Sequence, residues 1–188
     1  MNLISIKFFK RVQMFAKLLL ILVFTTTLIA HPTQITHYLL PMQNKQALES
    51  ILQSIENAQD SIYVMMFSFT HRDISRALKD AAAKGVKVKV IADKSQSKSR
   101  FSQIAYLNKY NNIKLYTLKG KRAQRGHMGS MHQKTVIIDK NLTYTGSANY
   151  SNSAFTIHYE NIIKFNCTDT AQKYREFFYT IKKGATTF

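Results

Sequence analysis

Cysteine and acidic residues are scarce in this sequence of 188 residues, and each scarcity excludes a class of site. The single cysteine, Cys167, rules out an intramolecular disulfide and any zinc finger built on paired cysteines. Only ten residues are Asp or Glu, and they are scattered along the chain. A site that holds two metal ions needs several carboxylates that converge. We therefore expect no disulfide scaffold, no bound metal and no cofactor.

The charges that are present are strongly unbalanced. The chain has 27 Lys and Arg residues and a formal net charge of +17 at pH 7. Four of these, Lys7, Lys10, Arg11 and Lys17, lie in the first thirty residues, which contain no acid. Without them the remainder keeps 23 basic and 10 acidic residues, a net charge of +13. Such a surface attracts polyanions, so the partners to consider are nucleic acid and an anionic membrane face.

The N-terminal apolar run is short of the roughly 20 residues that a comfortable membrane span needs. It covers Leu18–Ala30, 13 uncharged residues that follow the basic start. This is the layout of a secretory signal, so residues 1–30 are expected to be a signal peptide or an N-terminal membrane anchor. Leu28 stands where cleavage prefers a small residue, which leaves release and retention both open. The basic start keeps the N-terminus cytoplasmic, so we expect the rest of the chain to be periplasmic or secreted, or anchored to the inner membrane facing the periplasm.

Residues 31–188 are expected to form one domain in which strands and helices alternate. Apolar residues recur at helical spacing in several segments, and β-branched runs lie between them. The helices are expected over 44–60, 73–84, 101–107 and 170–183, with Phe101 and Phe177 inward, and the strands over 37–40, 61–69, 86–92, 113–117 and 162–165. This alternation predicts an α/β fold, a layered α/β/α sandwich with a mixed, largely parallel sheet. A hairpin over 133–145 adds antiparallel character.

A stretch from His132 to Glu160 carries the residues with the clearest chemistry. His132 and Lys134 are two apart at the start of an apolar strand, so their side chains should project to the same face. Asp139 follows that strand in a turn, and we expect it to hold the turn or an interface. The segment Gly146–Asn149 then supplies the hydroxyl of Ser147 and the amide of Asn149.

These residue types suit the cleavage of a phosphodiester. Neutral imidazole can attack phosphorus, and imidazolium can protonate the leaving oxygen at neutral pH. Lys134 supplies fixed positive charge, while Ser147 and Asn149 supply donors for the oxygens that gain charge. The reaction needs two imidazoles, but there is only one such motif in the chain. A symmetric homodimer would bring two copies of His132 together.

The pattern His132-Gln-Lys134, Asp139, Gly146-Ser147, Asn149 and Glu160-Asn161 resembles the HKD motif of the phospholipase D superfamily. Residues 61–70 and 84–89 are similar to the small bacterial endonucleases of that superfamily, and the resemblance covers roughly residues 35–183. It implies that single-motif members dimerise and that one His forms a phosphohistidine intermediate while its mate protonates the leaving group. It also implies that Glu160 orients the imidazole.

The segment Leu118–Met131 is expected to be a flexible basic loop that ends at His132. It has three glycines and no acid, and it carries Lys119, Lys121, Arg122 and Arg125. Placed beside the site, these four side chains would contact the phosphates of a substrate.

Together these features predict a metal-independent phosphodiesterase, an endonuclease that cuts DNA, and RNA if the site admits it, with little sequence preference. The alternative is a phospholipase D or cardiolipin hydrolase that acts on anionic lipid, associated with the membrane through residues 1–30. A non-catalytic DNA-binding protein is a third hypothesis, against which the intact His132, Lys134 and Asn149 argue. Tyr150 and Phe155 could stack on bases or pack in the core.

Overall fold

The computed structural model describes residues 10, 13 and 33–188. The chain divides into the units Met1–Pro32 and Thr33–Phe188, and the second unit carries all the elements considered below. Apart from residues 10 and 13, the predicted signal peptide or anchor over 1–30 lies outside the described residues. Within the part that is described, no helix is both long enough and apolar enough to cross a bilayer.

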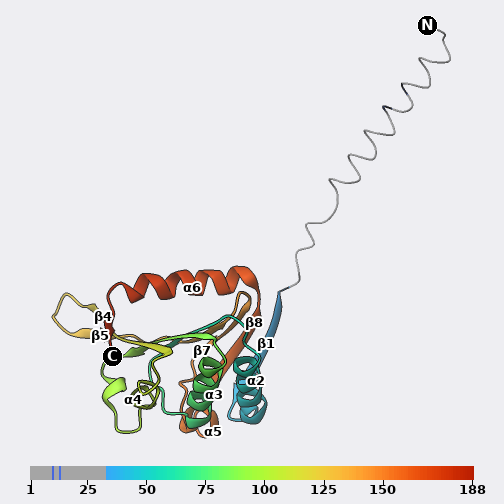
Figure 1. Ribbon diagram of the computed structural model, residues 1–188. Helices are drawn as coiled ribbons and strands as arrows, with labels where there is room; N and C mark the ends of the chain where they lie inside the picture. Colours follow the sequence, from blue (N-terminus) through green and yellow to red (C-terminus); the bar gives the residue numbers. More distant parts are fainter. Residues whose placement is uncertain (1–9, 11–12, 14–32) are drawn as a thin grey trace. The chain divides into compact units, whose positions relative to one another are not determined.

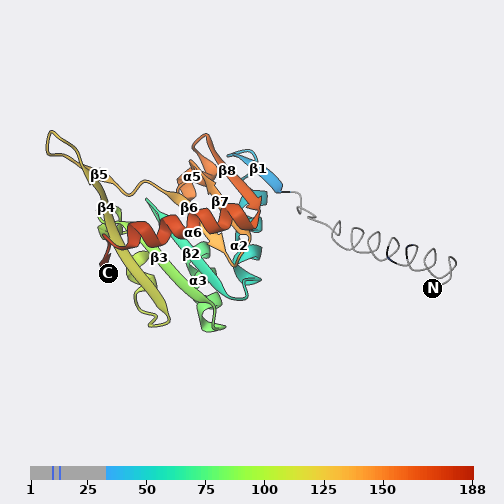
Figure 2. The same ribbon diagram turned by 90° about the horizontal axis from the view of Figure 1, so that it is seen from above.

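A nine-stranded sheet runs through the described unit, with α6 lying across one of its faces (Figure 2). Eight strands follow the spatial order β1-β8-β7-β6-β2-β3-β4-β5, and β9 pairs with β4. The strands are β1 Gln34–Leu40, β2 Ser61–Met66, β3 Lys87–Asp93, β4 Ile113–Arg122, β5 Met128–Ser130, β6 Lys134–Ile138, β7 Leu142–Gly146, β8 Glu160–Asn166 and β9 Thr186–Thr187.

The sheet is mixed, as predicted, but the expectation that it is largely parallel is wrong. Among the described strands, the parallel pairs are β2 with β3 and β3 with β4. Parallel neighbours need a crossover connection, which the segments that contain α3 and α4 supply here. The hairpin β6–β7 adds β6 antiparallel to β2, and β8 and β1 extend the sheet with further antiparallel pairs.

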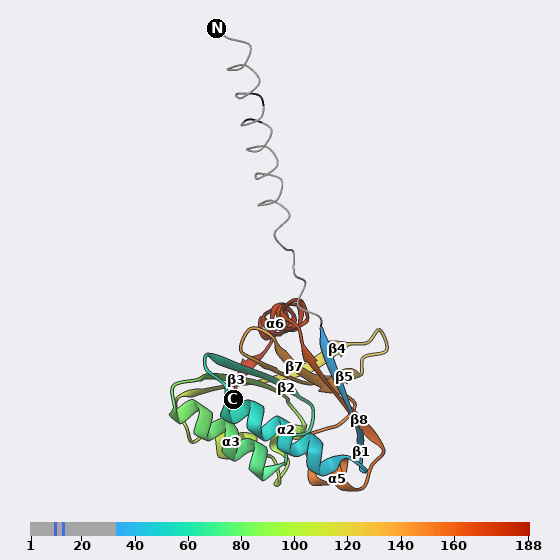
Figure 3. The same cartoon turned by 90° about the vertical axis from the view of Figure 1, so that its right-hand side faces the viewer.

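Helices cover both faces of the sheet, which confirms the predicted α/β/α layers (Figures 1 and 3). Helix α6, Thr168–Lys182, lies on one face, and the other face carries α2 Asn44–Glu56, α3 Arg72–Ala83, α4 Ile104–Leu107 and α5 Asn152–Thr156. A single-turn 3-10 helix, η1, spans Gln96–Lys98. Because side chains alternate along a strand, β2 sends Ile62, Val64 and Met66 into the larger core and Tyr63 and Met65 into the smaller core under α6. Every residue of β2 is therefore buried.

Two expected segments differ from the structure. The segment Leu118–Met131 is not an irregular loop, because β4 continues to Arg122 and pairs with β5 as a hairpin. The two strands come so close at Gly120 that a Cβ there would lie 2.5 Å from the backbone of Gly129. The helix expected over 101–107 begins only at Ile104, which leaves Phe101 58% exposed instead of packed inward.

Two further expectations concern aromatic residues. Phe177 was expected to face inward on α6, but it is 41% exposed. Tyr150 and Phe155 are both buried in the larger core, so of their two interpretations the packing role is the one observed. The short helix α5 that contains Phe155 was not predicted, since five residues carry too little periodicity to indicate a helix.

Candidate active site

His132 and Lys134 form a close pair at the N-terminal end of β6. The Nζ atom of Lys134 lies 2.9 Å from Nδ1 of His132 and donates a hydrogen bond of 2.9 Å to its backbone oxygen. The imidazole is exposed, whereas Lys134 is buried, with 8% of its surface accessible. Two residues at strand spacing thus place a reactive ring at the surface and a fixed cation directly behind it.

Phe67, which directly follows β2, packs against both members of the pair. Its ring centroid lies 4.5 Å from that of His132 and 5.0 Å from Nζ of Lys134. The backbone N–H of Phe67 donates to the oxygen of Gln133 at 2.8 Å, which fixes the ring beside the site. From the sequence, Phe67 is predicted only to lie in a buried strand; its position at the carboxyl end of that strand is the signal that could have indicated a site residue.

Burial lowers the pKa of Lys134, and the negative charge of Glu160 acts in the opposite direction and partly offsets that effect. Glu160 begins β8 opposite Leu40, and β7 separates β8 from β6. The structure therefore places Glu160 within electrostatic range of Lys134. Among the described residues it makes no hydrogen bond to His132, so the orienting role that the family resemblance gives it stays a prediction.

The contact with Lys134 has a consequence for the proton on His132. A charged ammonium can only donate, so Nδ1 of His132 is the acceptor when Lys134 is protonated. A neutral imidazole then carries its proton on Nε2, the nitrogen on the opposite edge of the ring. In this state the Nε2–H of His132 can donate a hydrogen bond to a group in the open space beyond it.

Asn149 and Ser147 are fixed by backbone contacts. The backbone N–H of Ser68 donates to Oδ1 of Asn149 at 3.2 Å, which turns the amide NH₂ of Asn149 away from Ser68. Three hydrogen bonds join Ser147 to Asn161: its hydroxyl accepts from the N–H of Asn161 at 3.0 Å, and its own N–H is shared between Oδ1 at 3.1 Å and the backbone oxygen at 3.2 Å. Gly146 permits this approach, since a Cβ there would lie 2.2 Å from the oxygen of Asn161. Among the described contacts none joins Ser147 to His132 or Lys134.

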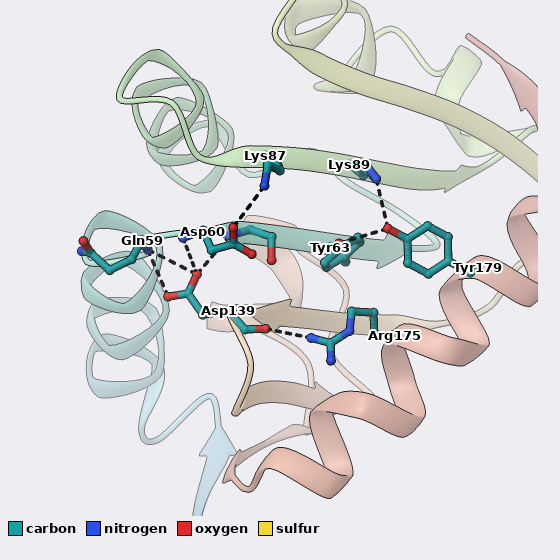
Figure 4. A network of polar contacts seen from close by, with 9 residues as sticks. Gln59, Asp60, Tyr63, Lys87, Lys89, Asp139, Arg175 and Tyr179 are labelled. Atoms are coloured by element: carbon teal, nitrogen blue, oxygen red, sulfur yellow. Dashed lines mark hydrogen bonds and ion pairs between the residues drawn. The ribbon is translucent and has the colours of Figure 1, made fainter.

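Asp139 lies at the opposite end of β6, about 23 Å along an extended chain from His132. Its carboxylate accepts hydrogen bonds from the backbone N–H groups of Gln59, Asp60 and Ser61 at 2.8–3.2 Å (Figure 4). Its backbone oxygen accepts from Arg175 of α6. Asp139 has a positive φ of 52°, which Asp tolerates better than most residues. Its contacts therefore tie the β6–β7 turn to the start of β2 and to α6, away from the imidazole.

A groove of about 820 Å³ opens beside His132 on the face that carries α6. Its lining includes His132, Lys94, Lys119, Lys121 and Phe177. Of the four basic residues predicted to contact substrate, the structure thus brings Lys119 and Lys121 to the imidazole. Arg122 and Arg125 are exposed further out on the β4–β5 hairpin and do not line this groove.

Lys94 and Asp93, at the C-terminal end of the parallel strand β3, were missed by the sequence analysis. Asp93 is 1% exposed, and its Oδ2 accepts a 3.0 Å hydrogen bond from the N–H of Met131, the residue before His132. Burial acts to raise the pKa of Asp93, but the hydrogen bonds from Ser95, Gln96 and Met131 together outweigh it and lower the pKa. The signal that could have found both residues is their place at the carboxyl end of a parallel strand, where α/β sites gather.

Among the described residues, no three His, Cys, Asp or Glu side chains gather as a group that could hold a metal ion. The polar side chains at the imidazole and in its groove include instead the ammonium groups of Lys94, Lys119, Lys121 and Lys134 and the amide of Gln133. Such a set can hold a phosphate and stabilise charge on its oxygens. The predicted absence of a metal requirement remains to be tested by chelation.

Comparison with known proteins places this arrangement in a family. The family model for the cardiolipin synthase, phospholipase D-like domain matches residues 51–182. The chain belongs to the phospholipase D superfamily. A phospholipase D from Rickettsia typhi is 30% identical over 164 residues, which are 80% of this chain and 75% of the relative. The chain spans only about 60% of the length of further curated relatives that it matches.

Two solved structures of the superfamily have the same fold, and each aligns with most of this chain. NucT from Helicobacter pylori is 36% identical, with a TM-score of 0.80 that covers 83% of this chain and 99% of that one. Nuc from Salmonella typhimurium is 27% identical, with a TM-score of 0.70 and coverage of 83% and 98%. The predicted family and α/β fold are therefore confirmed, and the protein is a phosphodiesterase of the phospholipase D superfamily.

Proposed function

We propose that the protein is an exported endonuclease that hydrolyses phosphodiester bonds of nucleic acid through His132, without a metal ion and as a homodimer. The observation that carries this proposal is the exposed imidazole of His132 at the edge of a groove lined by Lys94, Lys119 and Lys121. Three ammonium groups in one groove can contact successive phosphates of a polymer that carries one phosphate per nucleotide. The likeness to NucT and Nuc, with nearly complete coverage of both chains, supports the same substrate class.

In the proposed reaction Nε2 of one His132 attacks phosphorus in line and forms an N–P bond as the P–O bond to the leaving group breaks. His132 of a second subunit gives its Nε2 proton to the leaving oxygen. That second imidazole then takes a proton from water, whose oxygen attacks phosphorus and breaks the N–P bond. Lys134 and the amide NH₂ of Asn149 stabilise the phosphoryl oxygens in both steps.

The two imidazoles need different proton arrangements. The proton donor is an imidazolium, which carries a proton on both nitrogens, and the nucleophile is a neutral ring with Nε2 bare. Both states carry a proton on Nδ1, so a carboxylate that accepts from Nδ1–H, the role that the resemblance gives to Glu160, favours both of them. The hydrogen bond from Lys134 to Nδ1 favours a neutral ring with its proton on Nε2, so in this proposal Glu160 takes the place of Lys134 at Nδ1 before the reaction.

Exposed apolar side chains at the same edge of the sheet support a second copy as the partner. Leu39 and Met42 lie at the end of β1, whose last residue pairs with Glu160, and Ile157 and Tyr159 lead into β8. These four side chains are 55–87% exposed. A large apolar patch that borders a half-complete site is typical of a protein interface.

A phospholipase that acts on anionic lipid is the second candidate. The phospholipase D from Rickettsia typhi and the cardiolipin synthase description of the family model favour it. The same exposed apolar residues near β1 and β8 could contact the acyl chains of a bilayer.

One experiment separates the two candidates. Single- and double-stranded DNA, RNA and cardiolipin vesicles are incubated with the protein, with and without EDTA, beside the His132→Ala variant as the control. The endonuclease proposal expects cleavage of nucleic acid that survives EDTA and is lost in the variant. Turnover of cardiolipin alone would overturn it, as would loss of cleavage in EDTA or full activity in His132→Ala.

A further inference from the structure

A second pocket, distinct from the groove beside His132, lies on the face of the sheet that carries α3, α4 and α5. It has a volume of about 490 Å³. Its lining includes Arg72 and Arg76 of α3, Arg100 and Phe101 of the segment before α4, and Ser151 before α5. We call these residues the arginine pocket. None of them has a role in the reaction described above.

The arginine pocket is built on a fixed floor. The N–H of Thr70 donates to the oxygen of Tyr150 at 2.8 Å, and the N–H of Gln103 donates to the oxygen of Phe69 at 2.8 Å. Below these bonds the buried rings of Phe69 and Tyr150 pack edge to face, with centroids 5.9 Å apart. The three segments that form the pocket are therefore held together without a ligand.

Positive charge dominates this pocket. Its three arginines are exposed, and Asp73 is the one acid in its lining. Asp73 lies 3.1 Å from Nη1 of Arg76, but both side chains are more than half exposed, so water screens the pair and it contributes little. The guanidinium of Arg76 is thus available to a phosphate, and arginine binds phosphate through two parallel N–H donors.

Phe101 adds a flat apolar surface beside these charges. It is 58% exposed, and Cζ of Arg100 lies 4.4 Å from the centroid of its ring. An exposed aromatic ring next to an arginine is the combination on which unpaired bases stack in proteins that bind single strands. A free phosphate would use the arginines alone, whereas a nucleotide in a strand would use both.

Two short segments connect the arginine pocket with the active site. Phe67, which packs on His132, is three residues from Thr70 in the pocket lining, and Asn149 is two residues from Ser151. At no more than about 3.6 Å per residue, each segment spans roughly 7–11 Å at most. The next nucleotides of a strand whose phosphate lies at His132 can therefore reach the arginine pocket.

We propose that the arginine pocket binds a single-stranded stretch of the nucleic-acid substrate adjacent to the phosphate that is cleaved. Arg72, Arg76 and Arg100 contact one or two phosphates, and a base stacks on Phe101. The groove lined by Lys94, Lys119 and Lys121 lies on the opposite face of the sheet. A strand bound at both places therefore passes over the edge of the sheet at His132. This inference rests on the proposed nuclease function. It adds to that function a binding site for the stretch of substrate next to the cleaved phosphate.

The test uses the full chain with a fluorescein-labelled single-stranded DNA 12-mer. The dissociation constant is measured by anisotropy in the His132→Ala background over a series of NaCl concentrations, and KM and kcat are measured with His132 intact. The variants are Arg76→Gln/Arg100→Gln, Phe101→Ala and Phe101→Trp. The matched control, Lys84→Gln/Lys109→Gln, removes two exposed charges from the segments that precede β3 and β4, at the other end of these parallel strands.

The arginine variant is expected to bind more weakly and to lower the magnitude of the salt slope by about 1.4, because each single-strand phosphate contact contributes about 0.7. Phe101→Ala should raise the dissociation constant at least about fivefold, and Phe101→Trp should restore it. KM should follow the dissociation constant while kcat changes by less than about twofold. The control should keep the wild-type slope.

Three outcomes overturn the inference. If the arginine variant matches the control, or if Phe101→Ala binds as the wild type does, the arginine pocket does not hold the strand. If these variants lose only the hydrolysis of cardiolipin vesicles, the pocket binds a lipid headgroup instead. If the wild type cuts the 12-mer and the variants keep its dissociation constant and KM, this inference alone is refuted. If the wild type cuts no nucleic acid, the proposed function is refuted.

Discussion

Replacement of Asp93 by Asn should lower the stability of the protein and disturb the placement of His132. Oδ1 of Asp93 accepts from the N–H groups of Ser95 and Gln96 at 2.9 and 3.1 Å, and Oδ2 accepts from Met131. An amide has one oxygen, so its NH₂ group must face one of these two sets of donors. The N–H groups on that side lose their acceptor inside the protein, because Asp93 is almost fully buried.

The size of the effect follows from these contacts. A hydrogen bond to a charged group contributes about 1.5–3 kcal/mol, and a buried donor without a partner costs about 1–3 kcal/mol. We therefore expect Asp93→Asn to lower the free energy of unfolding by about 2–4 kcal/mol. Since His132 follows Met131 directly, release of Met131 should displace the imidazole. A shift of about 1 Å can lower the rate about 100-fold.

The pH dependence of the free energy of unfolding is a second test of the stabilising role of the Asp93 carboxylate. The hydrogen bonds hold the pKa of Asp93 below its usual value despite burial. Its contribution to stability is thus fully present above the unfolded pKa of about 3.9 and is lost as pH falls through the lower folded pKa. The difference in stability between wild type and Asp93→Asn should be full at pH 6 and should shrink below about pH 4.

Urea denaturation followed by circular dichroism, with kcat on an oligonucleotide, measures both effects. Asp80→Asn is the control, because Asp80 is exposed and its ion pair among residues 33–188 is with its neighbour Lys79 alone. It should change stability by no more than about 0.5 kcal/mol. If Asp93→Asn unfolds at the wild-type urea concentration and keeps the wild-type kcat, Asp93 neither stabilises this end of the sheet nor positions His132.

Three further predictions address the subunits, Lys134 and the thiol. If one site needs two copies of His132, co-refolding wild type with His132→Ala should give activity that falls as the square of the wild-type fraction; a linear fall would contradict the dimeric site. Because Glu160 raises the pKa of Lys134, Glu160→Gln should move the alkaline limb of the kcat/KM profile to lower pH; an unmoved limb would show that Lys134 does not set it. Hydrogen bonds from Thr170 lower the pKa of Cys167 to about 7, so iodoacetamide should react with a midpoint near pH 7, and a midpoint near 8.5 would contradict these bonds.

The periodicity of the sequence was sufficient to predict the α/β/α layers but not to predict which strands pair. The run 62–66 contains only hydrophobic residues, and helices cover both of its faces; that composition predicts a central strand. Which strands then become neighbours depends on contacts far apart in the chain, such as β2 with β6 and β1 with β8. Local patterns do not contain these pairings, so the share of parallel pairs was overestimated.

The basic hairpin shows why composition misled the prediction locally. Glycines and arginines without apolar alternation usually indicate a loop. Here Gly120 and Gly129 let two strands approach more closely than side chains would allow, so the same glycines form a hairpin. The hairpin carries Lys119 and Lys121 to the groove on an extended strand, which spaces their side chains on one face.

The spacing of the motif has a physical explanation in strand β6. The four residues between Lys134 and Asp139 are all buried: Val136 and Ile138 lie in the larger core and Ile137 lies in the smaller one. Their number is therefore set by the length of strand that crosses the protein interior. His132 and Lys134 emerge at one edge of the sheet, and Asp139 is bound by backbone N–H groups at the other. A shift of one residue would exchange every inward side chain between the faces. The contacts of Asp139 therefore secure the register that keeps Lys134 behind the imidazole, although its carboxylate lies at the opposite end of β6 from His132.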